Sequence, residues 1–212
     1  MWQDLTLINA DIPSEIFYGA DLNAEKAYHP NFEGIKYIHL YSYKKKENKS
    51  SNFFKFNQFE NLLSLELVLT NVTEFNDFKG CHSLKRLGLW RNRNLQSFEG
   101  ISDLSNHLEV LIIQYARKLK VDEELFQMKE LKTLSLVGIS PLESLDFLKH
   151  FPKLEKFVFV DTDVLNGDMT PLLEHPTLRY AGYLDKRHYN VKSDEMERLL
   201  KEKNGGISGV SK

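Results

Sequence analysis

The 212-residue chain has one cysteine and no long apolar run, and each shortage excludes a class of protein. Cys81 has no second cysteine with which to form an internal disulfide or a cysteine-based metal cage, which fits a reducing compartment. No apolar stretch approaches the roughly 20 residues of a membrane-spanning helix, and residues 1–4 lack the basic and apolar regions of a signal peptide. The sequence therefore predicts a soluble, cytoplasmic protein.

The chain also lacks an excess of charge of one sign. Lysine and arginine together number 28 and aspartate and glutamate 30, so the formal net charge is −2. No chain-wide positive field exists to gather a phosphate backbone or an anionic lipid surface, and we expect no nucleic-acid partner and no membrane partner. With 42% hydrophobic and 27% charged residues, the composition is typical of a folded globular chain and excludes intrinsic disorder.

Leucine, in contrast, is abundant, at 32 of 212 residues, and its positions repeat along the chain. The string apolar-x-x-apolar-x-apolar begins seven times, at anchors that are 22 to 27 residues apart: Ile35, Leu62, Leu84, Leu108, Leu131, Leu154 and Leu178. Further apolar residues precede the anchors at three-residue intervals, as Phe53, Phe56 and Phe59 do in the second copy. This spacing indicates one supersecondary unit that is stacked on itself.

The copies resemble the leucine-rich-repeat superfamily, whose L-x-x-L-x-L-x-x-N/C-x-L unit of about 20–29 residues is a strand followed by a helical or 3₁₀ turn. The match is closest in LKRLGLWRNRNL, where Asn92 stands at the asparagine position of the family. Thr70 and Thr162 replace that asparagine in two other copies, which predicts an irregular solenoid in place of a continuous asparagine ladder. The Lys-, Asn- and Phe-rich composition of these short repeats indicates a bacterial source.

The resemblance implies an α/β leucine-rich-repeat solenoid, with a curved parallel sheet on its concave face and helical or 3₁₀ turns on its convex face. We divide the chain into an N-terminal cap, about seven repeats, a C-terminal capping helix and a flexible tail: residues 1–31, 32–185, 186–203 and 204–212. Leu5 and Leu7 alternate in the cap, which we expect to be partly strand. Asp194 and Glu197 have the spacing of a capping box and predict the start of the terminal helix.

Seven strands are expected from the repeat. They fall near residues 36–41, 63–68, 85–90, 109–114, 132–137, 155–160 and 179–184. Because one unit cannot bury its own apolar face, the stacked units are expected to share one continuous core.

Residues that often carry chemistry fall at positions that the repeat explains. Four of the seven histidines lie on four different repeats and the other three lie toward the ends of the chain, without metal-ligand spacing, so we expect no metal and no cofactor. Cys81 stands where other copies have Phe59 and Phe151, which predicts a small buried hydrophobe and no nucleophile. The acidic clusters at 122–124 and 161–168 fall in predicted turns, where aspartate bonds to nearby backbone.

The predicted concave face is the informative surface, because alternate residues of each strand point outward there. Of its 21 positions only Glu66, Arg86 and Lys156 carry a formal charge. Strand propensity explains part of this bias, but charge depletion with aromatic enrichment also marks interface cores. We predict a non-enzymatic module that binds a protein partner through nine residues: Tyr37, His39, Tyr41, Glu66, Val68, Arg86, Trp90, Ile112 and Gln114. Gly88 is expected to leave room beside the Trp90 indole for a partner side chain.

Two other functions stay open at this point. The resemblance to the leucine-rich-repeat superfamily implies, by analogy alone, that a small cytoplasmic solenoid of this kind is a scaffold or an immunity-type protein that neutralises a toxin. A hydrolytic enzyme is the competing class, and it requires titratable groups that converge in a cleft. His39, Glu66 and Arg86, on the first three predicted strands, are the place to look for such a group.

Overall fold

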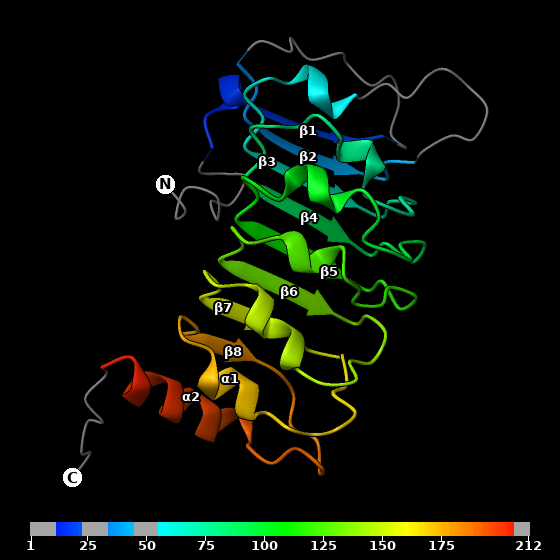
Figure 1. Ribbon diagram of the computed structural model, residues 1–212. Helices are drawn as coiled ribbons and strands as arrows, with labels where there is room; N and C mark the ends of the chain where they lie inside the picture. Colours follow the sequence, from blue (N-terminus) through cyan, green and yellow to red (C-terminus); the bar gives the residue numbers. More distant parts are fainter. Residues whose placement is uncertain (1–11, 23–33, 45–54, 206–212) are drawn as a thin grey trace.

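The computed structural model describes residues 12–22, 34–44 and 55–205. Within them eight strands pair in sequence order, all parallel, into one sheet (Figure 1). The strands are β1 (Phe17–Asp21), β2 (Tyr37–Tyr41), β3 (Ser64–Val68), β4 (Arg86–Trp90), β5 (Val110–Gln114), β6 (Thr133–Val137), β7 (Lys156–Val158) and β8 (Tyr180–Gly182). The last seven coincide with the strands expected from the repeat, although β7 and β8 end earlier than their predicted ranges.

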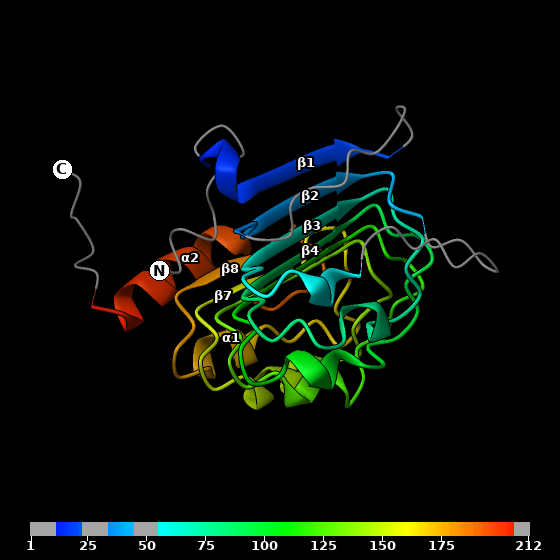
Figure 2. The ribbon, with the colours of Figure 1, turned by 90° about the horizontal axis from the view of Figure 1, so that it is seen from above.

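The short helices that connect the strands from β2 to β8 lie on one side of the sheet, and the core lies between the two layers (Figure 2). The 3₁₀ helices are η3 (Ser14–Ile16), η4 (Phe56–Gln58), η5 (Asn76–Phe78), η6 (Ile101–Leu104), η7 (Leu125–Gln127) and η8 (Asp146–His150). The α-helices are α1 (Thr170–Glu174) and α2 (Ser193–Lys203), of which α2 packs against β8 at the end of the sheet. This arrangement confirms the predicted α/β solenoid.

One strand, β1, was missed by the leucine pattern. Its register aligns Tyr18 with Ile38 of β2 and Ala20 with Leu40, and both residues pack partly buried against the core. Tyrosine and alanine therefore occupy the two inward positions that leucine or isoleucine fills in the next strands, so the repeat string is absent although the strand is present. The cap at residues 1–31 was expected to be partly strand, also because of the aromatic pair Phe17-Tyr18, and β1 lies within that range. Leu5 and Leu7, the other basis of that expectation, lie outside the described residues.

The core is a continuous column of aliphatic and aromatic side chains. Leu65, Leu87 and Leu111 occupy the same inward position on three successive strands and are fully buried. Behind them, Phe75 stacks on Phe98 of the next repeat, with ring centroids 5.5 Å apart. Full burial of a leucine or phenylalanine side chain contributes roughly 1.5–3 kcal/mol, so this column is the main source of stability.

A left-handed residue ends the strand in six successive repeats. Ser42, Leu69, Arg91, Tyr115, Gly138 and Asp161 all stand seven positions after their repeat anchors and have φ between 53° and 62°. The N–H of Leu69 donates to the Trp90 carbonyl at 2.9 Å, and that of Tyr115 donates to the Val137 carbonyl at 2.8 Å. Ser42 and Gly138 donate in the same way, to the carbonyls of Val68 and Val160, so four of the six residues add a backbone hydrogen bond between neighbouring repeats before the chain turns away from the sheet.

The turn after the strand and the start of α2 each differ from what a regular repeat would give. The Asn92 side chain is buried without a hydrogen-bond partner among the described residues, whereas the Thr162 hydroxyl donates to the Leu136 carbonyl at 2.8 Å. The solenoid is irregular at this position, as predicted. The capping-box prediction for α2 is wrong: the helix starts at Ser193, whose N–H donates to the Asp185 carboxylate at 2.8 Å.

Candidate protein-binding site

The face of the sheet opposite the 3₁₀ helices, which we call the open face, is the one predicted as concave. Strand register arranges its residues in rows that run across the strands. The rows over β2 to β5 are Tyr37, Ser64, Arg86 and Val110; then His39, Glu66, Gly88 and Ile112; then Tyr41, Val68, Trp90 and Gln114. The nine residues predicted for the site therefore lie together in three adjacent rows.

An ion cluster occupies the centre of this surface. Glu66 on β3 accepts a hydrogen bond on Oε2 from His39 Nδ1 of β2 at 2.9 Å, and Oε1 pairs with the Arg86 guanidinium of β4. A second guanidinium nitrogen, Nη1, donates to the Ser64 hydroxyl at 3.3 Å. Burial raises the pKa of Glu66, but the hydrogen bonds from His39 and Arg86 and the Arg86 charge outweigh it and hold the pKa at about 2.

The cluster is arranged for charge neutralisation more than for proton transfer. A general base works best when its pKa is near the working pH, whereas the Glu66 carboxylate is weakly basic and is engaged on both oxygens. The Ser64 hydroxyl receives its hydrogen bond from Arg86, which takes no proton from it. The convergence of His39, Glu66 and Arg86 foreseen for an enzyme is therefore real, but its geometry favours a structural pairing.

Trp90 folds back across its own strand. A Cβ placed on Gly88 lies 2.8 Å from the indole Nε1 and 3.3 Å from Cγ of Glu66. The expectation that Gly88 leaves room for a partner side chain is therefore wrong, because the indole itself fills that space. The indole N–H is buried there without an acceptor among the described residues. The ring is half-buried and presents one side to solvent next to Glu66.

Exposure differs between the rows. Tyr37 and Val110, in the first row, are buried despite their outward direction. In the third row, Tyr41 is 36% exposed and both Val68 and Trp90 are partly exposed. The solvent-accessible part of these rows is thus the third row together with the partly exposed ion cluster.

The far end of the open face carries apolar residues that the predicted set omitted. Tyr180 on β8 and Leu184 just after it are 48% and 53% exposed. The Lys156 ammonium lies 5.1 Å from the centroid of the Tyr180 ring, a cation–π distance. Both residues fall at outward positions of the repeat, so the alternation that found Trp90 contains the signal for them as well.

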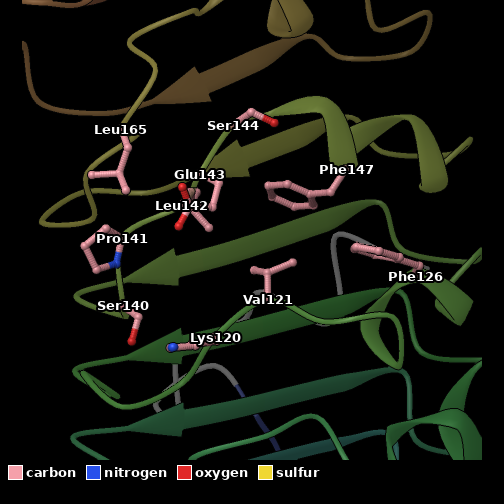
Figure 3. A pocket seen from close by; sticks show the side chains of 10 residues that line it. All are labelled: Lys120, Val121, Phe126, Ser140, Pro141, Leu142, Glu143, Ser144, Phe147 and Leu165. Atoms are coloured by element: carbon pink, nitrogen blue, oxygen red, sulfur yellow. The ribbon is translucent and has the colours of Figure 1, made fainter.

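A pocket of about 450 Å³ lies away from the open face, between the loops that follow β5, β6 and β7 (Figure 3). Its lining is Lys120, Val121, Phe126, Ser140, Pro141, Leu142, Glu143, Ser144, Phe147 and Leu165. Phe126 also stacks on His150, with ring centroids 4.4 Å apart. The pocket is mainly apolar, and the sequence gave no sign of it because three repeats contribute to it.

The remaining chemistry-bearing residues have structural roles. Cys81 is 4% exposed, and burial, together with the Asp103 charge, raises its pKa to about 12. His107 and His175 each place Nε2 near a carbonyl oxygen of the preceding repeat, at 3.0 and 3.1 Å. Asp122 accepts the backbone N–H of Glu124 at 3.1 Å, as predicted for a turn. No group of three metal-ligating side chains occurs within the described ranges.

The helices of the described residues are too short or too polar to cross a bilayer. No protein-family model and no curated protein matches the chain. Among solved structures, it is similar to internalin C2 of Listeria monocytogenes, with 19% identity and a TM-score of 0.52, over 73% of this chain and 66% of that one. An internalin of the same bacterium, inlF, aligns at 17% identity with a TM-score of 0.45, over 73% of this chain and 49% of that one.

This chain spans less than two thirds of the length of either structure. Identity at this level concerns the fold, and the activity of a relative does not transfer with it.

Proposed function

We propose that this leucine-rich-repeat solenoid is a non-enzymatic binding module that holds a protein partner on the open face over β2 to β5. One observation carries the proposal: aromatic side chains gather beside an ion cluster that neutralises itself. Tyr41 and Trp90 are accessible in one row, and the Glu66 carboxylate next to them is paired on both oxygens. Tyrosine, tryptophan and arginine are the residues that most often anchor protein interfaces.

The paired charges support this role. A partner that covers the open face removes water from Glu66, and an unpaired buried carboxylate destabilises a complex strongly. Because His39 and Arg86 already satisfy it, an apolar partner surface can lie over the cluster without leaving a charge unpaired. The third row then supplies the apolar contact with the partner, and the charges of the ion cluster orient the partner on the open face.

Cys81 bears on the cellular setting. It is the one cysteine of the chain and a free thiol, which supports a cytoplasmic location. The open face serves a scaffold and a toxin-neutralising protein equally well, since both act by covering a partner surface. We infer no cofactor for either role.

Truncation of Trp90 tests the proposal. The partner is first isolated from the native host with the full chain, and its affinity is then measured by calorimetry for the wild type and Trp90→Ala. We expect Trp90→Ala to weaken binding roughly 30-fold or more, because an anchoring aromatic commonly contributes about 2 kcal/mol or more. The melting temperature of the variant should change little beside that of a core variant.

Tyr180→Ala is the matched control, since it truncates an exposed aromatic at the far end of the same face. Lys79→Glu, on the side of the 3₁₀ helices, is a second control. Normal binding by Trp90→Ala together with loss of binding in Lys79→Glu contradicts the open-face site.

A further inference from the structure

We propose a second binding surface, the basic edge, formed by five cations in the loops after β4 and β5. Its members are Arg91, Arg93, Arg117, Lys118 and Lys120. With the apolar pocket beside it, this edge fits an extended acidic segment of a partner protein that carries an apolar side chain. The proposal rests on residues outside the open-face site and does not depend on the function proposed above.

Among the described residues, none of the five cations of the basic edge is paired with a carboxylate. All five are exposed, and no ion pair or side-chain hydrogen bond joins any of them to another described residue. Neither loop, 91–97 or 115–121, contains an aspartate or glutamate. Asp122, which directly follows the second loop, accepts the backbone N–H groups of Phe98 and Glu124. The edge is therefore a local positive field on a chain with a net charge of −2.

At the amino-terminal ends of the strands, opposite the basic edge, the charges of neighbouring repeats are paired. One residue before each strand, Lys85, Glu109 and Lys132 alternate in sign on successive repeats. Glu109 receives both lysines, with nitrogen to oxygen distances of 3.6 Å to Lys85 and 2.8 Å to Lys132. Equivalent positions of neighbouring repeats lie side by side, about 5 Å apart. Alternation at such a position stabilises the stack.

The basic edge reverses that pattern. Trp90 pairs with Gln114 in the sheet, so Arg93 and Arg117, three residues later, occupy the same position of neighbouring repeats. Two arginines at one position repel each other and destabilise the fold slightly. The repeats alternate their charges just before the strands but place like charges side by side in the loops after β4 and β5. This contrast supports an acidic partner, whose carboxylates would neutralise the unpaired positive charges.

The pocket adjoins the basic edge directly. Lys120 belongs to both, and Ser140, another lining residue, donates its hydroxyl to the Arg117 carbonyl at 2.9 Å (Figure 3). Leu142 and Leu165 form the apolar side of the pocket, and Leu165 is 53% exposed. An extended segment with acidic residues on the two basic loops thus brings its next residue over an apolar hollow of about 450 Å³.

The charge along this edge changes sign at the pocket. Glu143, Asp161 and Asp163 follow β6 and β7, and Lys186 pairs with Asp163 at 3.1 Å. A nucleic-acid backbone continues with a phosphate at every nucleotide and would run from the cations onto these carboxylates. A protein segment can confine its acids to the loops after β4 and β5, so the edge favours a peptide that is acidic at one end and apolar at the other.

Selection from a random peptide library displayed on phage tests this surface with the full chain as bait. Peptides of about twelve residues span up to roughly 40 Å when extended, more than the two loops and the pocket require. We expect enrichment of sequences in which a cluster of Asp and Glu adjoins one apolar residue. Fluorescence anisotropy of a labelled winner should show at least about a tenfold loss of affinity with the double variant Arg93→Glu/Arg117→Glu. Binding should also weaken as ionic strength rises.

Three variants separate the parts of the proposal. Leu165→Ser should weaken the winning peptide without a change in its salt dependence, because Leu165 is exposed and contributes only to the pocket. Lys79→Glu/Lys149→Glu makes the same charge change on the side of the 3₁₀ helices and should leave affinity unchanged. Winners without an acidic bias, equal affinity in the Arg93/Arg117 variant, or tighter binding of a labelled oligouridylate than of any peptide each overturn the proposal.

Discussion

On β3, β4 and β5 the inward side chains are leucine or isoleucine throughout, whereas the outward ones change on every strand. Leu65 and Leu87 share one inward position and are both fully buried. At the outward position beside them stand Glu66 and Gly88, which have nothing in common chemically. The inward set keeps one chemistry because every unit must bury against its neighbours. The outward set has no such constraint, so its departures from uniformity are where function is expected.

The most damaging single change should be made on the inward side. Leu87→Ala removes a fully buried side chain from the middle of the core column and should lower the free energy of unfolding by about 2–5 kcal/mol. Urea denaturation followed by circular dichroism measures it. If Trp90→Ala, three residues later, costs as much as Leu87→Ala, the assignment of inward and outward positions is wrong.

The ion cluster should give the outward side its largest contribution to stability. The pKa of Glu66 is about 2 in the folded chain against an ordinary 4.5, so its stabilisation is complete above the ordinary value and is lost as the pH falls from about 5 to about 2. The shift from 4.5 to about 2 corresponds to about 3 kcal/mol. Glu66→Gln should therefore be less stable at pH 7 and should flatten the stability profile in that window. Glu60→Gln, an exposed carboxyl, is the control and should keep the wild-type profile.

A smaller effect is expected where Trp90 covers Gly88. An added Cβ meets the indole at 2.8 Å, so Gly88→Ala should displace the ring toward solvent and destabilise the chain by about 1 kcal/mol. In a Trp2→Phe background, the emission of Trp90 should shift to longer wavelength. The same Gly88→Ala change should have no such penalty in a Trp90→Ala background. A penalty that persists there shows that the Glu66 side chain, 3.3 Å from the added Cβ, and not the indole rejects the methyl group.

The smallest effect concerns the inward thiol. Cys81 is buried and its pKa is raised to about 12, so a thiol reagent should modify the native chain only as fast as it unfolds. Labelling followed by mass spectrometry gives that rate, and urea should accelerate it in step with unfolding. Fast labelling without denaturant contradicts an inward position for Cys81.

The periodic part of this fold was predictable and the aperiodic part was not. Seven strands followed from the leucine repeat. The row positions of Trp90 and Glu66 followed from the alternation of inward and outward residues along a strand, which decides the face that each residue joins. The strand β1 escaped because Tyr18 and Ala20 carry no leucine pattern. The course of the indole over Gly88 depends on side-chain torsions, which neighbours in space determine.

The pocket and the basic edge illustrate a second limit. Val121, Leu142 and Leu165 come from three repeats, and their convergence depends on how far each loop extends beyond its strand. The arginines of RNRN and ARKLK are evident in the printed sequence, but their unpaired state follows only from what stands beside them in the stack. Contacts between neighbouring repeats cannot be read from the sequence of one repeat at a time.

The left-handed residue at each strand end also acts as a register mark. In three repeats it is flanked on both sides by β-branched residues, in the triplets Val68-Leu69-Thr70, Val137-Gly138-Ile139 and Val160-Asp161-Thr162. A slip by one residue in either direction would force a β-branched side chain into positive φ, the conformation that such residues resist most. It would also turn every leucine to the open face. A misaligned repeat is thus destabilised both by backbone strain and by exposure of its leucines, which favours one pairing of these similar units during folding.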